Sequence, residues 1–268
     1  MVEKVVSHPL RKAGRSETAG IEQQWLELPE LGTVDVWATA LTAKAEDLVN
    51  LEKTLSPTEI DRASRFHFEE HRTRFIVGHA RLRQLLGRYL SIPAHSIEFE
   101  RGKNGKPQLA GEAAATRLDF NLSHSDQLSL TAITRGKPVG IDLEHVRPLS
   151  DANDLVRRFF SKREAAAFAI MPEDQKPFAF FRLWTRKEAW LKATGEGITY
   201  LLDQVEVSFA PGEPAQLIKL PQGWPGAAGW SLCHLEPGLG YVGAVAIASR
   251  NTRVRFRLWD NTSNEVAL

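Results

Sequence analysis

The stretch from Phe181 to Gly197, FRLWTRKEAWLKATGEG, places an acid and a base inside a strongly apolar segment. It is predicted to form one helix, on which Glu188 and Lys192 lie one turn apart. Charged groups on such a helix are costly to bury unless something binds them. Two simpler interpretations stay open. The pair could be a surface ion pair worth about 0.2–0.5 kcal/mol, and Trp184 and Trp190 could be core residues.

A second informative stretch, VGIDLE, runs from Val139 to Glu144 and is predicted to be a strand. Alternate residues of a strand share a face, so Asp142 and Glu144 point the same way. Ile141 and Leu143 then face the interior. Two carboxylates this close repel each other unless a cation or a proton intervenes. The alternative is a solvated strand face.

Glu188 can add a third carboxylate to this pair. Oxygen ligands of this kind suit Mg²⁺, which commonly combines carboxylates with water and phosphate oxygens. Lys192, one turn further along the helix, could reach the same phosphate. The helix and the strand together therefore predict a divalent cation that holds a phosphate group.

A phosphate ligand raises the question of nucleic acid, and the composition argues against it. The chain has 268 residues and a net charge of +1, which gives no overall attraction to nucleic acid or to a membrane. No stretch approaches the about 18 uninterrupted apolar residues of a membrane span. Cys233 is the only cysteine, which excludes an intramolecular disulfide and a cysteine metal site. We expect a cytoplasmic protein.

The order of predicted elements indicates an α+β fold. Residues 1–24 are polar and aperiodic, and we expect a disordered N-terminal extension. Strands are predicted at 34–41, 97–100, 118–122, 128–134, 139–144, 204–209, 216–220, 230–236 and 240–247. Helices are predicted at 43–55, 69–89 and 175–194, and after capping boxes at 56–66 and 161–170.

Strands and helices follow the same order twice, with a break at Gly136-Lys137-Pro138. The prediction is two similar halves, residues 25–138 and 139–268, related as a pseudo-twofold intramolecular dimer. Each half is expected to be a small antiparallel sheet packed with helices, and the second half carries the metal site.

Three further patterns could serve a phosphate ligand. FNLSHS places Ser123 and His124 where a strand is predicted to turn, and a histidine beside a phosphate would be protonated. The turn at 101–107 contains Asn-Gly, which tolerates positive φ. Guanidinium groups suit phosphate binding, and the helices at 56–66 and 69–89 carry Arg62, Arg65, Arg74, Arg81 and Arg83. A plain hairpin, a plain turn and a solvated basic face are the alternatives.

Taken together, the motifs NGKP, FNLSHS, VGIDLE, FFSKRE and WTRKEAWLK resemble the 4′-phosphopantetheinyl transferases of the larger, surfactin-synthetase-activating type. The resemblance covers about Val34 to Ile247, and WTRKEA is similar to the subgroup with tryptophan and KEA. It implies an enzyme that moves the phosphopantetheine arm of coenzyme A to a serine of an apo carrier protein, with Mg²⁺, and releases adenosine 3′,5′-bisphosphate. It also implies a monomer with the coenzyme A site between the halves.

The resemblance implies a role for each matching residue. Asp142, Glu144 and Glu188 would bind the metal, and Lys192 would contact the diphosphate. Contacts to coenzyme A are implied for Arg62, Arg74, Gly105, Lys106, Pro107, Ser123, His124, Arg147 and Lys192. Catalytic roles are implied for Glu188, Lys192 and Glu164. Glu164, in FFSKRE, is the proposed general base, and Glu188 or a metal-bound water are the alternatives.

One position departs from the family pattern. The family often has two lysines directed toward the 3′-phosphate, and this chain has Glu59 and Arg62 there. The 3′-phosphate would then depend on Arg62, Arg74 and His124. If position 59 faces the phosphate, Glu59→Lys is expected to strengthen binding of coenzyme A more than of its dephospho form.

Carrier proteins of this kind are generally acidic around the target serine, and LVRRFF offers arginines beside aromatics. The predicted contact residues are Leu155, Arg158, Phe159 and Phe160, and the alternative is that the two phenylalanines are core. A nucleotide phosphohydrolase and a non-catalytic coenzyme A or carrier-binding protein are the rival functions. The intact set of three carboxylates and Lys192 argues against the second.

Overall fold

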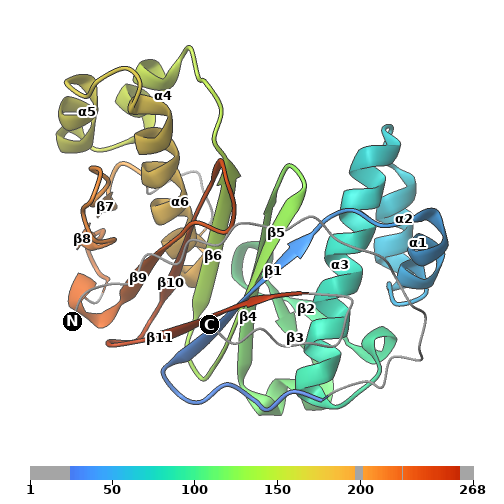
Figure 1. Cartoon of the computed structure of the whole chain (residues 1–268). Helices are drawn as coiled ribbons and strands as arrows, with labels where there is room; N and C mark the ends of the chain where they lie inside the picture. The colour runs from blue at the N-terminus through green and yellow to red at the C-terminus, as the bar shows by residue number, and fades with distance from the viewer. Residues whose placement is uncertain (1–24, 197–201, 225, 260–268) are drawn as a thin grey trace.

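A computed structural model describes residues 25–196, 202–224 and 226–259, and most of its strands form two sheets (Figure 1). The predicted extension, residues 1–24, lies outside the described residues. The first sheet has the order β11-β1-β5-β4, with bounds Arg253–Leu258, Thr33–Ala40, Leu128–Arg135 and Leu118–Ser125. The second has the order β6-β10-β9, with bounds Val139–His145, Tyr241–Ile247 and Ser231–Leu235. Two short hairpins join β2 (Phe99–Arg101) to β3 (Pro107–Leu109) and β7 (Glu206–Val207) to β8 (Leu217–Lys219).

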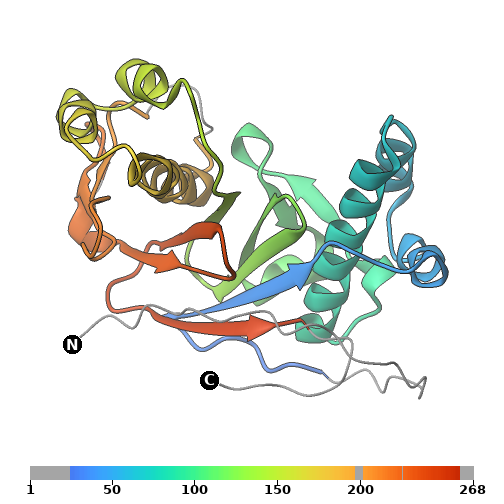
Figure 2. The ribbon, with the colours of Figure 1, turned by 45° about the horizontal axis from the view of Figure 1, so that its top comes forward.

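The two sheets lie between two long helices, α3 (Glu69–Leu90) and α6 (Lys176–Thr194) (Figures 1 and 2). Helix α3 packs on the face of the first sheet that carries Trp37, Phe120 and Ile133. The opposite face of that sheet packs on the second sheet, where Ile141 and Leu143 are buried as predicted. Helix α6 covers the outer face of the second sheet. The order of layers is therefore helix, sheet, sheet, helix.

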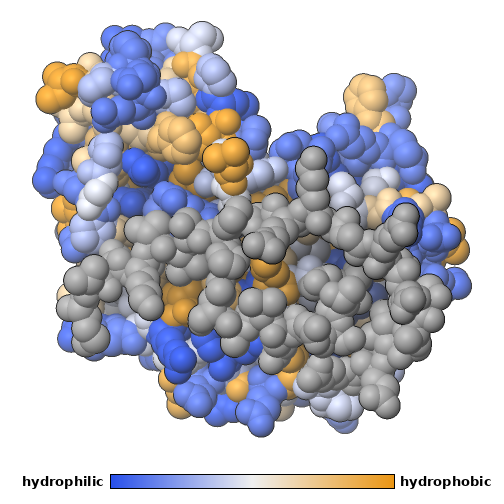
Figure 3. Space-filling model, viewed as in Figure 1, coloured by the Kyte–Doolittle hydropathy of each residue, from blue (hydrophilic) through white to orange (hydrophobic). Residues whose placement is uncertain are grey.

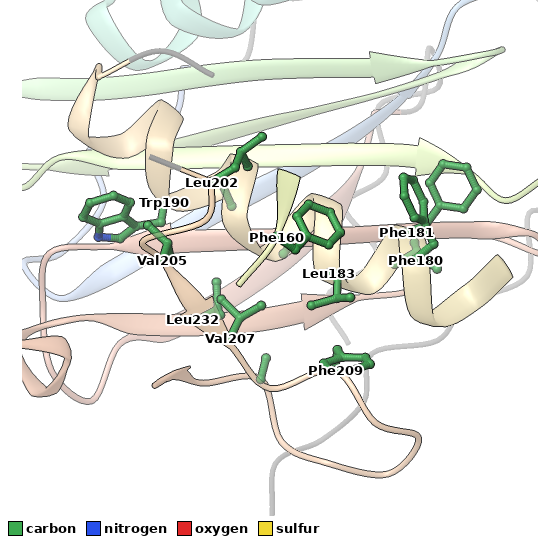
Figure 4. Packing of buried hydrophobic residues seen from close by; sticks show 14 of the residues in the cluster. Phe160, Phe180, Phe181, Leu183, Trp190, Leu202, Val205, Val207, Phe209 and Leu232 are labelled. Carbon is green, nitrogen blue, oxygen red and sulfur yellow. The ribbon is translucent and has the colours of Figure 1, made fainter. Parts of the chain in front are cut away.

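Helix α6 is buried along most of its length, and aromatic residues surround it (Figure 4). Trp190 is fully buried, and its ring lies 5.0 Å from that of Trp224 and 5.9 Å from that of Trp230. Trp184 is half-buried and stacks on Phe180. The core interpretation is therefore correct for Trp190.

Two of the shorter helices begin where their capping residues predict. Helices α2 (Pro57–Ser64) and α5 (Lys162–Ala169) each have a complete capping box, which satisfies N–H groups at the first turn. Helix α1 spans Ala45–Glu52, inside the predicted range. Short 3₁₀ turns lie at Ala94–Ser96, Lys103–Gly105, Gly111–Thr116 and Ala227–Gly229.

Four elements differ from the prediction. Helix α4 (Ala152–Phe159) and strands β3 and β11 have no predicted counterpart. Strand β4 continues to Ser125, so the predicted turn at Ser123 and His124 is wrong, and only Asp126 and Gln127 separate β4 from β5. Contacts with other strands extend β4. Strand β5 pairs with it as far as Ser125, and the main chain of β6 donates hydrogen bonds to side chains of β4.

The α+β class with small sheets packed by helices is confirmed. Strand β11, from the C-terminal part of the chain, lies parallel to β1, so this pair of strands departs from the expected antiparallel arrangement. The pseudo-twofold relation and the division at residue 138 stay predictions. Figure 3 shows a surface hollowed between the region of α4 and α5 on one side and the end of α3 on the other.

Candidate active site

Side chains of β4 bind the main chain of β6. Acceptors at alternate positions of β4 face N–H groups at alternate positions of β6, twenty residues later in the sequence. The bonds run from Val139 N to Asp119 Oδ2 (2.7 Å), Ile141 N to Asn121 Oδ1 (2.9 Å), Leu143 N to Ser123 Oγ (3.3 Å) and His145 N to Ser125 Oγ (3.0 Å). Because β6 is the end strand of its sheet, these side chains satisfy its open edge and join the two sheets.

Gly140 allows α6 to lie in backbone contact with β6. A Cβ atom at this position would stand 2.2 Å from the carbonyl oxygen of Ala189 and 2.2 Å from the amide nitrogen of Ala193. No side chain fits there, so the glycine of VGIDLE sets the distance between strand and helix. That distance brings the predicted residues of the two elements together.

The carboxylates of Asp142 and Glu188 meet at this contact, and both are almost fully buried. Asp142 Oδ1 accepts hydrogen bonds from Ser123 Oγ (2.9 Å) and Lys192 Nζ (2.6 Å). Glu144 Oε2 accepts from Ser125 Oγ (3.0 Å). Asp142 Oδ2 and both oxygens of Glu188 are buried without a hydrogen-bond partner among the described residues.

The protonation of these acids reflects their crowding. The pKa of Glu188 is raised to about 7, first by burial and then by the charge of Asp142, with Lys192 acting in the opposite direction. Burial and Asp142 also raise the pKa of Glu144, against hydrogen bonding from Ser125 and the charges of Arg147 and Lys192. The site therefore holds more negative charge than its protein neighbours balance.

A divalent cation is a chemically suitable partner for these acids. Buried carboxylate oxygens without donors are the ligands that Mg²⁺ accepts, and three are present here. Within the described residues, no three His, Cys, Asp or Glu side chains are close enough together to hold a metal by themselves. The donor set fits Mg²⁺, and further oxygens would have to come from water or substrate.

The hydroxyl of Ser123 has three bonds inside the protein. It donates to Asp142 and accepts from Leu143 N and from Lys192 Nζ (3.1 Å), which uses its one proton and both lone pairs. A phosphate contact through this oxygen would break one of these bonds. The geometry instead makes Ser123 an orienting group for Asp142.

His124 is exposed on β4 and lies among positive charges. Its pKa is lowered by the partial burial of the ring and then by His79, Lys192, Arg74 and Arg62. Positive charges gathered around a histidine repel one another, and a bound anion would relieve this repulsion. Arg62 and Arg74 are thus near enough to His124 for their charges to act on it.

The predicted arginines differ in how firmly they are held. Arg74 donates to Asp126 Oδ1 (2.9 Å) and also bonds Glu70. Asp126 connects further to Tyr241 Oη (3.4 Å), so it links α3 to β10. Arg62 is exposed, with its guanidinium over the ring of Phe75.

Arg147 is exposed at the end of β6, beyond the acids. Its guanidinium lies 3.7 Å from Glu144 Oε2 and covers the ring of Phe181. Arg147 is therefore next to Glu144, one of the acids predicted to bind a metal.

Glu59 has a structural role, and the expectation that it faces a phosphate is not supported. Its carboxylate accepts from Ser56 N (2.8 Å), from Arg83 Nε (2.7 Å) and from the ring of His79 (3.2 Å). Burial would raise the pKa of Glu59, but His79, Ser56 and Arg83 together lower it to about 2. A lysine at this position would lose the capping box and face the buried Arg83, so Glu59→Lys is not a useful test of binding.

The turn before β3 contacts the end of α6. Asn104 and Gly105 have the positive φ values of 52° and 84° that the Asn-Gly pair predicts, and Asn104 Nδ2 donates to Gly195 O (2.7 Å). Lys106 Nζ donates to Asp119 Oδ2 (3.0 Å) and Val139 O (2.9 Å).

Lys106 lines a cleft of about 450 Å³ between β3, β4 and the end of α6. Pro107 is exposed beside it at the start of β3. The NGKP turn therefore borders a cleft next to the α6–β6 contact.

Glu164 does not have the surroundings of a general base. It is 3% exposed, and its oxygens accept from Lys187 Nζ (2.6 Å), Ser161 N (3.0 Å) and Val207 N (3.0 Å). A base must come within about 3 Å of the proton it removes. The prediction that Glu164 acts as the base does not agree with this closed environment.

The predicted carrier contacts divide into two groups. Phe160 is buried between Phe180 and Trp184, so it is core and not an exposed anchor. Phe159 is 36% exposed, and the guanidinium of Arg158 lies over its ring. Leu155 is half-buried against the same core.

Sequence reasoning did not identify Ser125, Asp126, His79 or Lys187. For Ser125 a signal was present, since polar residues alternate at positions 119, 121, 123 and 125. A strand with polar residues on one face, next to an acidic strand, indicates bonding between the two.

Among the described residues, no helix is both long enough and apolar enough to cross a membrane.

Comparison with known proteins places the chain in a family. A family model described as 4′-phosphopantetheinyl transferase superfamily matches residues 138–246, and one described as 4′-phosphopantetheinyl transferase, N-terminal, matches residues 40–135.

Individual relatives agree with these matches. The chain is 41% identical over 241 residues to the 4′-phosphopantetheinyl transferase HetI of Nostoc sp., covering 88% of this chain and 98% of that protein. It is 30% identical over 153 residues to the 4′-phosphopantetheinyl transferase Sfp of Bacillus subtilis, covering 57% of this chain and 66% of that protein. These matches show that the chain belongs to the 4′-phosphopantetheinyl transferase superfamily, in its surfactin-synthetase-activating type.

Proposed function

We propose that this chain transfers the 4′-phosphopantetheine arm of coenzyme A to a serine hydroxyl of an apo carrier protein, in a reaction that needs Mg²⁺. The observation that carries the proposal is the contact between α6 and β6. There, three buried carboxylate oxygens of Asp142 and Glu188 have no hydrogen-bond partner among the described residues, and Lys192 lies beside them. Membership of the transferase superfamily supports the same reaction.

In this proposal Asp142, Glu144 and Glu188 would hold the cation together with oxygens of water or substrate, because the described side chains do not form a complete metal site by themselves. A bound Mg²⁺ would offset the negative charge of the diphosphate and polarise the transferred phosphorus. Ser123 and Ser125 keep Asp142 and Glu144 oriented through their hydroxyl groups. Lys192 supplies a further positive charge for the diphosphate, where charge builds on the leaving group.

The positive cluster around His124 is proposed to hold the 3′-phosphate. Arg62 and Arg74 contribute charge, and Arg74 is held in place by Asp126. Arg147 adds charge beside Glu144. Gly105, Lys106 and Pro107 are proposed to border the adenine, since the cleft beside Lys106 opens next to the end of α6.

The reaction breaks the bond between the transferred phosphorus and the bridging oxygen of the diphosphate, and forms a bond from that phosphorus to the serine oxygen. Adenosine 3′,5′-bisphosphate leaves with the bridging oxygen. The serine proton passes to a base, for which Glu188 or a water at the site are the candidates. The nucleophile belongs to the partner, so phosphoryl transfer needs only positioning and charge from this chain.

The carrier is proposed to dock on α4, where Arg158 and the exposed ring of Phe159 lie on the surface and Leu155 is half-buried. Positive charge beside an exposed aromatic suits an acidic helical partner. We propose a monomer, because one chain supplies both α6 and the strands that face it. The cytoplasm is the proposed compartment, since Cys233 as the only cysteine leaves no intramolecular disulfide.

Incubation with coenzyme A, Mg²⁺ and a panel of apo carriers, followed by mass spectrometry of the carriers, tests the proposal. The expected result is a mass gain of one phosphopantetheine arm on at least one carrier, lost when EDTA is added. Unchanged carriers throughout the panel, or equal transfer with EDTA, would contradict it. Release of inorganic phosphate from nucleotides without a carrier would favour a phosphohydrolase instead.

A further inference from the structure

Lys187 precedes Glu188 on α6 and is fully buried. Its ammonium donates to Glu164 Oε2 (2.6 Å), to Leu202 O (2.6 Å) and to Val205 O, which matches its three protons with three acceptors. The ring of Phe160 lies 4.9 Å from the same nitrogen. The lysine therefore ties α6 to the start of α5 and to the segment before β7.

Glu164 completes this network from the other side. Oε2 also accepts from Ser161 N and Oε1 accepts from Val207 N, so the carboxylate closes the cap of α5 and holds β7. Each of its oxygens has a donor, and its side chain is 3% exposed. A fully bonded buried network of this kind fixes the parts that it joins.

The network and the metal-site acids lie on different sides of α6. Successive residues of a helix point about 100° apart, and Lys187 and Glu188 are neighbours in the chain. Lys187 points toward α5 and the 202–207 segment, whereas Glu188 interacts with Asp142 on β6. The direction of Glu188 therefore depends on how α6 is rotated, and Lys187 holds that rotation.

We infer that Glu164 is a positioning residue, which fixes α6 through Lys187 so that Glu188 faces Asp142, and that it does not remove the serine proton. The inference rests on the proposed function, because it concerns a residue of the same reaction. It predicts that the charges of Glu164 and Lys187 matter only as a pair. A catalytic base, in contrast, is needed whatever the residue at 187.

The test compares three variants: Glu164→Gln, Lys187→Met and the double variant. The rate of carrier modification is measured at several pH values, and the free energy of unfolding is measured in urea. Each single variant leaves an unpaired buried group, so both are expected to be less stable and to turn over more slowly. In the double variant the glutamine at position 164 leaves no charge that needs Lys187, and the methionine at position 187 removes the buried ammonium while it keeps the volume of the lysine stem. The double variant is expected to regain both stability and turnover relative to Glu164→Gln, with the wild-type pH profile.

The opposite result would identify a base. Loss of a general base costs on the order of 10²–10⁴-fold in rate, and the double variant would then remain as slow as Glu164→Gln. A Glu164→Gln protein as stable as wild type that is inactive and has lost the basic limb of its pH profile would overturn the inference.

If the other variants do not fold, Lys187→Arg provides a second test, because it keeps both Glu164 and the positive charge at position 187. A guanidinium cannot place three donors as the ammonium does, so slower turnover with an unchanged pH profile is expected. Wild-type turnover in Lys187→Arg would overturn the inference. If wild-type protein modifies no carrier, the proposed function fails, whereas the coupling of positions 164 and 187 is still measured by unfolding.

Discussion

Lys192 Nζ lies 2.6 Å from Asp142 Oδ1, so a cation of the protein's own is paired with one of the acids at the α6–β6 contact. The other oxygen of Asp142 and both oxygens of Glu188 have no partner among the described residues. At Asp142 and Glu188 the site therefore contains buried acid groups that Lys192 offsets only in part, and this imbalance makes its chemistry testable.

Glu188→Gln should remove most of the transferase activity without harm to the fold. The amide carries no charge for the cation, and loss of one such electrostatic contact costs about 10²–10³-fold in rate. Stability should stay equal or increase, since the buried carboxylate has no donors. Carrier modification and urea unfolding measure the two effects, with the exposed Glu112→Gln as a control. Near-normal turnover at ordinary Mg²⁺ would contradict the ligand role.

Gly140→Ala should displace α6 from β6. The new methyl group would lie 2.2 Å from backbone atoms of Ala189 and Ala193, which cannot move independently. Overpacking against backbone should cost about 3 kcal/mol or more, and a shift of about 1 Å at the site should cost about 100-fold in rate. Gly226→Ala is the matched control, because nothing lies within 4 Å of a Cβ atom there. Equal free energies of unfolding for the two variants would show that α6 can move away from β6 at little cost, and would contradict the prediction.

Asp35→Asn should destabilise the protein through β11. The buried Asp35 accepts from Arg255 Nε (2.5 Å), Arg255 Nη2 (2.8 Å) and Tyr89 Oη (2.6 Å). The expected cost is about 2–4 kcal/mol, below that of a fully buried pair because Arg255 is 31% exposed. Urea unfolding measures it. Asp61→Asn, which breaks an exposed pair with Arg65, should cost less than about 1 kcal/mol, and similar losses in both variants would contradict the prediction.

Glu59 should make stability fall in acid. Its pKa of about 2 in the folded protein is below the ordinary value of 4.5, so its contribution is complete above pH 4.5 and disappears as pH falls toward 2. After allowance for solvent screening, this contribution is roughly 1–3 kcal/mol. The difference in unfolding free energy between wild type and Glu59→Gln should therefore shrink across that range. A difference that does not change with pH would show that the charge is not what stabilises α2.

Coenzyme A should bind more tightly at lower pH if His124 contacts the 3′-phosphate. The pKa of His124 is lowered in the free protein by partial burial and by neighbouring cations, and a bound phosphate favours the protonated ring. Binding then takes up a proton, and affinity rises as pH falls toward the lowered pKa of the free ring. Isothermal titration with coenzyme A and with its dephospho form measures this. The same pH dependence for both ligands would place His124 elsewhere.

Much of the fold follows from local patterns in the sequence. The capping boxes at Ser56 and Ser161 mark the starts of α2 and α5, and alternation along VGIDLE identifies both faces of β6. The acids predicted to bind a metal are visible in the sequence because the spacing of Asp142 and Glu144 is set within one strand, and that of Glu188 and Lys192 within one helix. The approach of helix and strand was predicted from the chemistry of these acids, but its cause, the missing side chain of Gly140, was not identified.

Long-range partners account for what was not predicted. Glu59 and Glu164 look like available acids in the sequence, yet Arg83 and Lys187, more than twenty residues away, bind them in the interior. Strand β4 was predicted too short because FNLSHS is polar, and the bonds from Leu143 and His145 that stabilise Ser123 and Ser125 come from another sheet. Strand β11 has the alternating pattern RVRFRL, a strand signal that the prediction missed, whereas its pairing with β1, far away in the sequence, has no local signal.

The parallel pairing of β11 with β1 has a consequence for biosynthesis. The first sheet receives its last strand from residues 253–258, so on the ribosome it cannot be completed until these residues have emerged, long after β1. Until then β1 keeps an open edge, and a long interval between partner strands slows folding and exposes the chain to aggregation. Truncation ahead of Arg253 would leave that edge open permanently, although no residue of the α6–β6 contact would be lost.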